Sequence, residues 1–214
     1  WQAQASALEG SKLIMAGGLL STSTGDQALL MQLNAQAQKQ TNFAAQGELS
    51  WKPLASRSSQ ISHLSLNGQQ LWAVGSLGKS DPQQTLDIYL QKILPFADTN
   101  TTAPAKSAEV FNLKGNALPL AYLRLESAGL IAGSYQPVDG NGVAGAREML
   151  LLKHDANGKL DKSFNKVGWG TISFANQPAE VQALLKLANG NFLALGCVQS
   201  GDIKFAAIQV KNNG

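Results

Sequence analysis

The sequence is poor in cysteine, histidine and charge, and each shortage narrows the kinds of site that it can build. Cys197 is the only cysteine, so neither an intrachain disulfide nor a cysteine zinc site can form. There are two histidines, and charged residues make up 14% of the 214 residues, whereas about a quarter is usual. The longest apolar run, residues 13–20, is too short for a bilayer helix, which needs about 20 residues. We therefore predict no membrane span.

The start of the sequence carries no recognisable targeting signal. The first residue is Trp1 rather than Met, so we expect a processed chain, a fragment or a numbering that begins internally. No signal peptide is visible, and a single thiol does not identify the redox compartment.

The positive charge is spread along the chain rather than gathered. The net charge is +3 and the isoelectric point about 9.0, but lysine and arginine are scattered from Lys12 to Lys211. Nucleic-acid-binding proteins concentrate such charge in a patch. The densest set is interrupted by two aspartates and is interpreted as a solvated loop: Lys153, Lys159, Lys162 and Lys166, with Asp155 and Asp161. We predict no nucleic-acid partner.

What the sequence does contain is glycine, 21 residues of it, placed at regular intervals. Four short apolar runs end in glycine followed by a small residue. The glycines recur at spacings of 58, 58 and 63 residues, at Gly17, Gly75, Gly133 and Gly196. Such self-similarity at a period near 60 indicates a repeat architecture.

Each glycine run is flanked by further strand-like segments. A strand and a turn precede it, at residues 6–10, 65–68, 124–129 and 186–190; Asn67-Gly68 and Asn189-Gly190 are strong hairpin signals. A third strand follows at residues 28–34, 87–94, 149–155 and 205–211. A fourth follows in three repeats, at residues 48–54, 108–113 and 169–174. The unit is therefore four antiparallel strands in about 60 residues.

These units predict an all-β, β-propeller-like fold. No unit has a convincing helical period, and the second strand of each is apolar on both faces, as expected for small sheets stacked face to face. We predict one repeat domain over residues 1–214, with blades at about 1–58, 59–116, 117–178 and 179–214. A linear β-solenoid is the alternative, but its repeats are usually shorter.

The third repeat carries a more specific motif at residues 152–164, LKHDANGKLDKSF, followed by Gly168. It resembles the delta-60 repeat of bacterial proteins, whose pattern runs roughly R-L-N-x-D-G-x-L-D-x-S-F-G-x-x-G. The first repeat keeps Phe43 and Gly47, each 121 residues before its counterpart, but has Lys39-Gln40 in place of Leu160-Asp161. The second repeat replaces the motif with Pro95-Phe96 and a polar loop at residues 98–107. The resemblance implies a propeller-like bacterial secreted or envelope protein, with no established activity.

The motif itself is interpreted as structural. Asn157-Gly158 should turn the chain after the third strand, and Asp161 and Ser163 should accept backbone N–H bonds at the corner. We expect Phe43 and Phe164 to be buried in equivalent positions between neighbouring blades.

The last repeat is incomplete, since the sequence stops after its third strand. The blade at residues 179–214 would then present an unpaired edge, which tends to recruit other strands. We predict that a protein partner, or sequence absent here, completes this edge.

None of the candidate functional residues forms a convincing site in the sequence. His63 and His154 lie at strand ends in different repeats and are interpreted as satisfied or solvent-facing. The series Asp155, Asn157, Lys159, Asp161 loosely resembles a calcium loop but fits a turn better. The spacing Gly140-x-Gly142-x-x-Gly145 opens no helix and is read as part of a mobile hairpin loop.

Carbohydrate chemistry is the remaining alternative. Glycosidases need paired carboxylates, and Glu9 and Glu126 occupy equivalent first-strand ends two blades apart, where they could face each other across the axis. The four tryptophans are scattered, and we expect them to pack between blades rather than to form a sugar platform: Trp1, Trp51, Trp72 and Trp169.

We predict a non-enzymatic interaction or scaffold module of a bacterial cell-envelope or secreted assembly. Its location would be periplasmic, cell-surface or extracellular, and protein partners would bind its loops, axial face or open edge. We assign no catalytic, cofactor-binding or metal residue and no cofactor. The alternative is a carbohydrate-binding module or glycoside hydrolase that uses the axial face.

Overall fold

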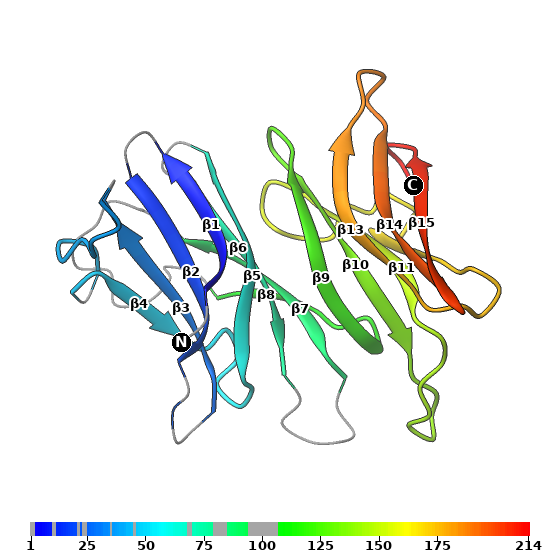
Figure 1. Cartoon of the computed structure of the whole chain (residues 1–214), viewed down its shortest axis with the longest axis horizontal. Coiled ribbons are helices and arrows are strands. Elements are labelled where there is room, and N and C mark those ends of the chain that lie inside the picture. Colours follow the sequence, from blue (N-terminus) through cyan, green and yellow to red (C-terminus); the bar gives the residue numbers. More distant parts are fainter. Residues whose placement is uncertain are drawn as a thin grey trace. The chain divides into compact units, whose positions relative to one another are not determined.

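The structure is a computed structural model, and it describes residues 3–9, 12–20, 22, 25–34, 36–44, 46–67, 70–78, 85–93 and 107–214. Within the strands, the side chains of residues 3, 4, 8, 9, 12–20 and 67 lie outside this description. The described residues form fifteen β-strands and no helix, so the all-β prediction is confirmed (Figure 1). In this part of the chain there is no helix that could cross a bilayer.

The strands divide between two compact units. Unit 1 comprises Trp1–Gln84 and Ile88–Phe111, and unit 2 comprises Thr85–Asp87 and Asn112–Gly214. Each contains two antiparallel sheets whose strands follow one another in chain order. The prediction of a single domain over residues 1–214 stays a prediction.

Unit 1 holds two four-stranded sheets. The first has the order β1-β2-β3-β4, formed by β1 (Ala3–Glu9), β2 (Lys12–Leu20), β3 (Gln27–Leu33) and β4 (Glu48–Trp51). The second has the order β5-β6-β7-β8, formed by β5 (Ser59–Asn67), β6 (Gln70–Leu77), β7 (Asp87–Ile93) and β8 (Glu109–Phe111).

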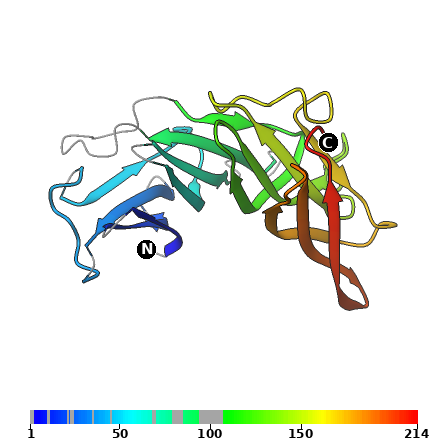
Figure 2. The same ribbon diagram turned by 90° about the horizontal axis from the view of Figure 1, so that it is seen from above.

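Unit 2 holds a four-stranded and a three-stranded sheet, which Figure 2 shows in green to red. The third sheet of the chain is formed by β9 (Gly115–Arg124), β10 (Gly129–Pro137), β11 (Glu148–His154) and β12 (Trp169–Ile172). The last sheet has only β13 (Ala179–Lys186), β14 (Phe192–Ser200) and β15 (Asp202–Val210). Among the described residues this sheet has three strands, so the prediction that the last blade is incomplete is confirmed.

The four regularly spaced glycines, Gly17, Gly75, Gly133 and Gly196, occupy equivalent positions. Each lies in the second strand of its sheet, opposite a bulge in the first strand. The pairing register of the first two strands shifts beside each of them. A Cβ atom at Gly75, Gly133 or Gly196 would overlap a carbonyl oxygen of the neighbouring strand, namely that of Gln60, Leu118 or Glu180. Glycine is needed where two backbones approach this closely. The repeat deduced from glycine spacing is confirmed.

Each unit has its own core between its two sheets. In unit 1, Phe43, Leu49 and Trp51 of the first sheet pack with Ile61, Leu71, Tyr89 and Ile93 of the second. In unit 2, the third sheet contributes Leu130, Met149, Leu151 and Phe164, and the last contributes Val181, Phe192, Ala194 and Val210. The cores form because alternate strand residues point to one face, where apolar side chains can be buried.

The β3–β4 loop of unit 1 and the β11–β12 loop of unit 2, which carry the motif and are called the motif loops, share the same backbone hydrogen bonds. In unit 1 the amide of Gln40 donates to the carbonyl of Gln32 (2.9 Å) and that of Gly47 to Phe43 (2.6 Å). In unit 2 the corresponding donors and acceptors are Asp161 to Lys153 (2.9 Å) and Gly168 to Phe164 (2.7 Å). The rings are buried as predicted, with Phe43 4% and Phe164 1% exposed. The resemblance to the delta-60 repeat itself stays a prediction.

The turn within each loop also matches the expectation. The Asp155 side chain accepts the amides of Asn157 (2.8 Å) and Lys159 (2.9 Å), and Gly158 has a φ of 86°. In unit 1 the Asn34 side chain accepts the amides of Gln36 and Gln38 in the same way. These bonds confirm the predicted turn, in which the Asp155 side chain accepts backbone amides.

The second strands are not all buried on two sides. Residues 71–77 of β6 and 129–134 of β10 are buried without interruption. Along β14, buried and half-buried residues alternate. The prediction of two-sided burial is therefore wrong for the last sheet, whose outer face carries exposed side chains such as Ile203 and Phe205.

Candidate functional site

A polar cleft lies at one end of the two sheets of unit 2. The β9–β10 turn, the β13–β14 turn and the loop after β11 meet there and enclose about 410 Å³. Small-molecule sites usually occupy about 300–1,000 Å³. We name it the polar cleft; it is lined by Leu125, Glu126, Ser127, Ala128, Lys153, Asp161, Lys186, Gly190, Phe192 and Asn212.

Two tight turns carry the exposed charged groups of the cleft. The β9–β10 turn is closed by the amide of Leu125 donating to the carbonyl of Ala128 (3.0 Å), and it exposes Glu126. The β13–β14 turn uses Gly190 at a φ of 83°, as its Asn-Gly signal predicted, and follows the exposed Lys186. Both turns thus hold a charged side chain at the rim.

Lys153 forms the floor of the cleft and is almost wholly buried. Its side chain is 9% exposed, and Nζ lies 3.3 Å from Oδ2 of Asp161. It also donates to the carbonyl oxygen of Asn212 (3.1 Å) and to Oδ1 of the same residue (3.0 Å). An ammonium group has three donors, and all three have acceptors here, which is what a buried charge requires.

Asp161 is held as a carboxylate from two directions. Its Oδ1 accepts the hydroxyl of Ser163 (2.6 Å) and the amide of Ser163 (3.0 Å), while Oδ2 faces Lys153. The Ser163 hydroxyl and the Lys153 ammonium lower the pKa of Asp161 below its usual value. Asp161 thus accepts a backbone N–H bond as predicted, and the Ser163 hydroxyl donates to the same carboxylate.

Asn212 links the segment after β15 to the cleft. Its amide donates to Oδ1 of Asn191 (3.3 Å) and its own Oδ1 accepts from Lys153, which leaves Nδ2 as a donor. The cleft therefore offers acceptors on Glu126 and Asp161 together with donors on Lys186 and Asn212.

Of the predicted carboxylate pair, the structure places Glu126 in the polar cleft. Glu9 belongs to unit 1, and its side chain lies outside the described residues, so the pair stays a prediction. The second acid of the cleft is Asp161, which sequence reasoning treated only as a turn residue. One signal in the sequence could have revealed the role of Asp161. At the equivalent positions, 121 residues earlier, the first repeat has the neutral Gln32 and Gln40 in place of the charged Lys153 and Asp161.

His154 is a buried, satisfied histidine, as predicted. It is 1% exposed, and its ring stacks on Tyr122 with centroids 5.8 Å apart. Nδ1 lies 2.8 Å from the Asp155 carbonyl oxygen, so it carries the proton, and Nε2 accepts the Tyr122 hydroxyl at 3.0 Å. Burial lowers the pKa of His154 and raises that of Tyr122, so both stay neutral at pH 7.

The other candidate residues that the structure describes lie in strands, turns or aromatic contacts outside the polar cleft. His63 is half-buried in the middle of β5, so the prediction that it lies at a strand end is wrong. The side chain of Asp139 accepts the amides of Asn141 and Val143 in the turn that contains the glycine spacing. Trp51 and Trp72 are buried, and Trp169 lies against Tyr135 with ring centroids 5.6 Å apart. Trp1 lies outside the described residues.

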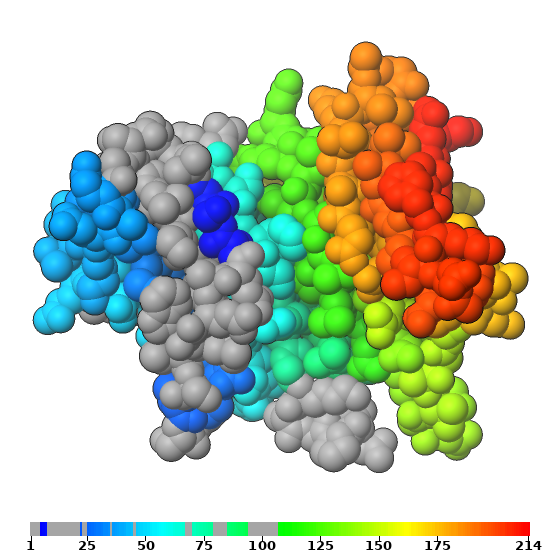
Figure 3. Space-filling model, viewed as in Figure 1, coloured from blue at the N-terminus to red at the C-terminus, as the bar shows by residue number. Residues whose placement is uncertain are grey.

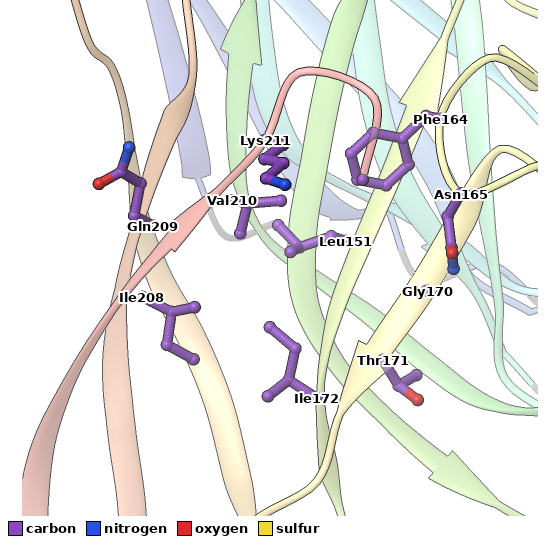
Figure 4. Close-up of a pocket in the computed structure, with 11 residues that line it drawn as sticks. Leu151, Phe164, Asn165, Gly170, Thr171, Ile172, Ile208, Gln209, Val210 and Lys211 are labelled. Atoms are coloured by element: carbon purple, nitrogen blue, oxygen red, sulfur yellow. The ribbon is translucent and has the colours of Figure 1, made fainter.

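A second cleft in unit 2 has a mixed lining with somewhat more apolar than polar surface. It encloses about 400 Å³ between β12 and β15 and is lined by side chains of both, as Figure 4 shows. Leu151, Phe164 and Ile172 face it from the third sheet, and Ile208 and Val210 from the last. We name it the β12–β15 groove; Asn165, Gly170, Thr171, Gln209, Lys211 and Gly214 complete its lining.

Comparison with known proteins finds similarity at the level of the fold. No family model and no curated protein sequence matches the chain. An exo-1,5-α-L-arabinanase from a bovine ruminal metagenomic library is 10% identical, with a TM-score of 0.48 over 98% of this chain and 71% of that one. A β-1,3-galactosidase of glycoside hydrolase family 43, solved with galactodeoxynojirimycin, is 11% identical, with a TM-score of 0.48 over 97% and 71%. An α-L-arabinofuranosidase from Clostridium thermocellum is 10% identical, with a TM-score of 0.45 over 92% and 60%.

These comparisons describe the fold class and correct one prediction. The described residues have an all-β, β-propeller-like fold of antiparallel sheets, three of them with four strands and the last with three. The solved structures similar to this chain are glycosidases, and with this finding the prediction of a non-enzymatic scaffold module is corrected. At these identities the likeness concerns the fold alone, so the function of this chain rests on its own residues.

Proposed function

We propose that this chain binds carbohydrate in the polar cleft of unit 2. The observation that carries the proposal is the gathering of Glu126, Asp161, Lys186 and Asn212 around one cleft of about 410 Å³. A sugar hydroxyl both donates and accepts hydrogen bonds, so it is matched by a site that holds acceptors and donors together.

The charged pair in the cleft supports this role because the fold does not require it. The loop of unit 1 makes the same backbone bonds with Gln32 and Gln40 at the positions of Lys153 and Asp161. Burying an ion pair costs desolvation energy that a neutral pair avoids. Lys153 therefore acts as a positioning residue that keeps Asp161 ionised and fixes Asn212 at the cleft.

Hydrolysis of the bound glycan is the second candidate function, favoured by the presence of two carboxyl groups in one cleft. Glycoside hydrolysis commonly uses one carboxyl group as acid and another as base or nucleophile. Asp161, with its lowered pKa, suits the ionised role. Glu126 is the second carboxyl group and lies at the exposed rim.

The experiment is a glycan array with the full chain, followed by calorimetric titration of the best-bound glycan. Glu126→Gln should weaken binding about tenfold or more, since a charge-assisted hydrogen bond contributes about 1.5–3 kcal/mol. Glu148→Gln is the matched control, because Glu148 lies at the opposite end of β11. Release of reducing ends from the same glycan tests hydrolysis. An array without signal, or equal binding by both variants, would refute the site.

A further inference from the structure

Among the described residues, the last sheet lacks the fourth strand that its counterpart in unit 1 has. In unit 1 the second sheet ends in β8, which pairs with β7 through Ile88, Tyr89 and Leu90. In unit 2 the last sheet ends at β15, and no described strand pairs with its outer edge. Edge backbone groups of this kind are a template for another strand. Figure 3 shows the C-terminal strands, in orange and red, at the surface of unit 2.

The β12–β15 groove lies beside this edge. It is bounded by Ile172 of β12 on one side and by Ile208 and Val210 of β15 on the other. Leu151 and Phe164, which are 3% and 1% exposed, form its apolar floor. An open apolar volume of about 400 Å³ at a sheet edge can receive side chains as well as backbone.

The position of β8 shows what the groove can hold. Val110 of β8 pairs with Tyr89, and it packs with Ala108 against the core between the two sheets of unit 1. In an antiparallel pair, residues directly opposite each other point to the same face. A residue added opposite Ala206 or Ile208, which pack against the core of unit 2, would therefore point into the groove.

We infer that the β15 edge and the β12–β15 groove together bind an extended segment of another polypeptide as a fourth strand. The segment has small or branched apolar side chains at alternate positions, as Val110 of β8 and the preceding Ala108 are in unit 1. Its side chains extend the apolar interface that already joins the third and last sheets. Its backbone completes the hydrogen bonds of β15, so binding depends on main-chain pairing and on the groove at once.

The test uses the full chain and a synthetic peptide with the sequence of residues 105–114, AKSAEVFNLK, which contains β8. Binding is followed by fluorescence titration, and amide hydrogen exchange is measured along β15. We expect a dissociation constant below about 1 mM and slower exchange in residues 205–210. Replacing valine by aspartate in the peptide should weaken binding more than about tenfold, because a carboxylate would enter an apolar groove.

Protein variants separate the groove from the exposed surface. Ile208→Lys should abolish peptide binding, whereas Ile203→Lys, on the same strand but 76% exposed, should leave it unchanged. The aspartate peptide keeps the test decisive even if Ile208→Lys fails to fold. Binding without slower exchange in β15, equal binding of both peptides, or dimerisation of the chain through β15 in place of peptide binding would overturn the inference.

Discussion

Units 1 and 2 share one plan of two packed sheets, and two of the differences between them concern the clefts of unit 2. In unit 1 the end of β3 and the loop after it hold Gln32 and Gln40, and the second sheet has β8 as its fourth strand. In unit 2 the same loop positions hold Lys153 and Asp161, and the last sheet stops at β15. The shared parts are the bulges, the loop backbone and the buried phenylalanine. The comparison teaches that these parts build the repeat. The parts that differ lie at the clefts: Lys153 and Asp161 line the polar cleft, and β15 borders the β12–β15 groove.

The largest expected effect tests whether the buried phenylalanines of the two motif loops contribute equally to stability. Phe43→Ala and Phe164→Ala each remove a ring that is at most 4% exposed. Each should lower the free energy of unfolding by about 3–5 kcal/mol, because a cavity replaces the ring. Urea denaturation of the full chain measures both. A loss of less than about 1 kcal/mol at one site and a large loss at the other would break the comparison.

The second-largest effect tests whether the Lys153–Asp161 pair is needed for glycan binding rather than for folding. Asp161→Gln alone leaves Lys153 buried without its carboxylate and should cost about 1–3 kcal/mol. The double variant Lys153→Gln with Asp161→Gln copies unit 1 and should recover most of that loss. It should still fail to bind the glycan that the wild-type chain binds.

Urea denaturation and calorimetric titration of the same samples check this expectation. The double variant of Lys39→Gln with Glu48→Gln is a matched control, since that ion pair of unit 1 is exposed and 2.9 Å long. A double variant that stays as unstable as Asp161→Gln would show that the pair is needed for folding.

Much of the repeat could be predicted from the sequence, because glycine is needed wherever two strands come too close for a Cβ atom. The spacing of Gly75, Gly133 and Gly196 therefore revealed the sheets, and the 121-residue offset of Phe43 and Phe164 revealed the loops. The motif also drew attention to Asp161, but as a turn residue.

The polar cleft could not be predicted in the same way. Glu126, Lys186 and Asn212 lie far apart in the sequence and share no motif. They meet because the β9–β10 and β13–β14 turns fall at the same end of two packed sheets. That depends on how the last sheet packs on the third, which the strand pattern alone does not contain. The open face of β14 was missed for the same reason, since its apolar residues resemble those of β6 and β10.

The smallest effect concerns pH and compares His154 with Leu33, its counterpart 121 residues earlier. The pKa of His154 is lowered by burial, so the unfolded chain binds this proton at a higher pH than the folded one. Stability is then full above the unfolded pKa of about 6.5 and falls as the pH drops toward the lower folded pKa. One proton limits the slope to about 1.4 kcal/mol per pH unit.

Combining His154→Leu with Tyr122→Phe should remove this slope and leave no unpaired hydroxyl, because the two side chains bond each other. Tyr122→Phe alone is the control and should keep the slope. Urea midpoints between about pH 5 and 7.5 measure the difference. An unchanged slope in the double variant would mean that another group titrates there, and the neutral Tyr122–His154 pair would then not distinguish unit 2 from unit 1.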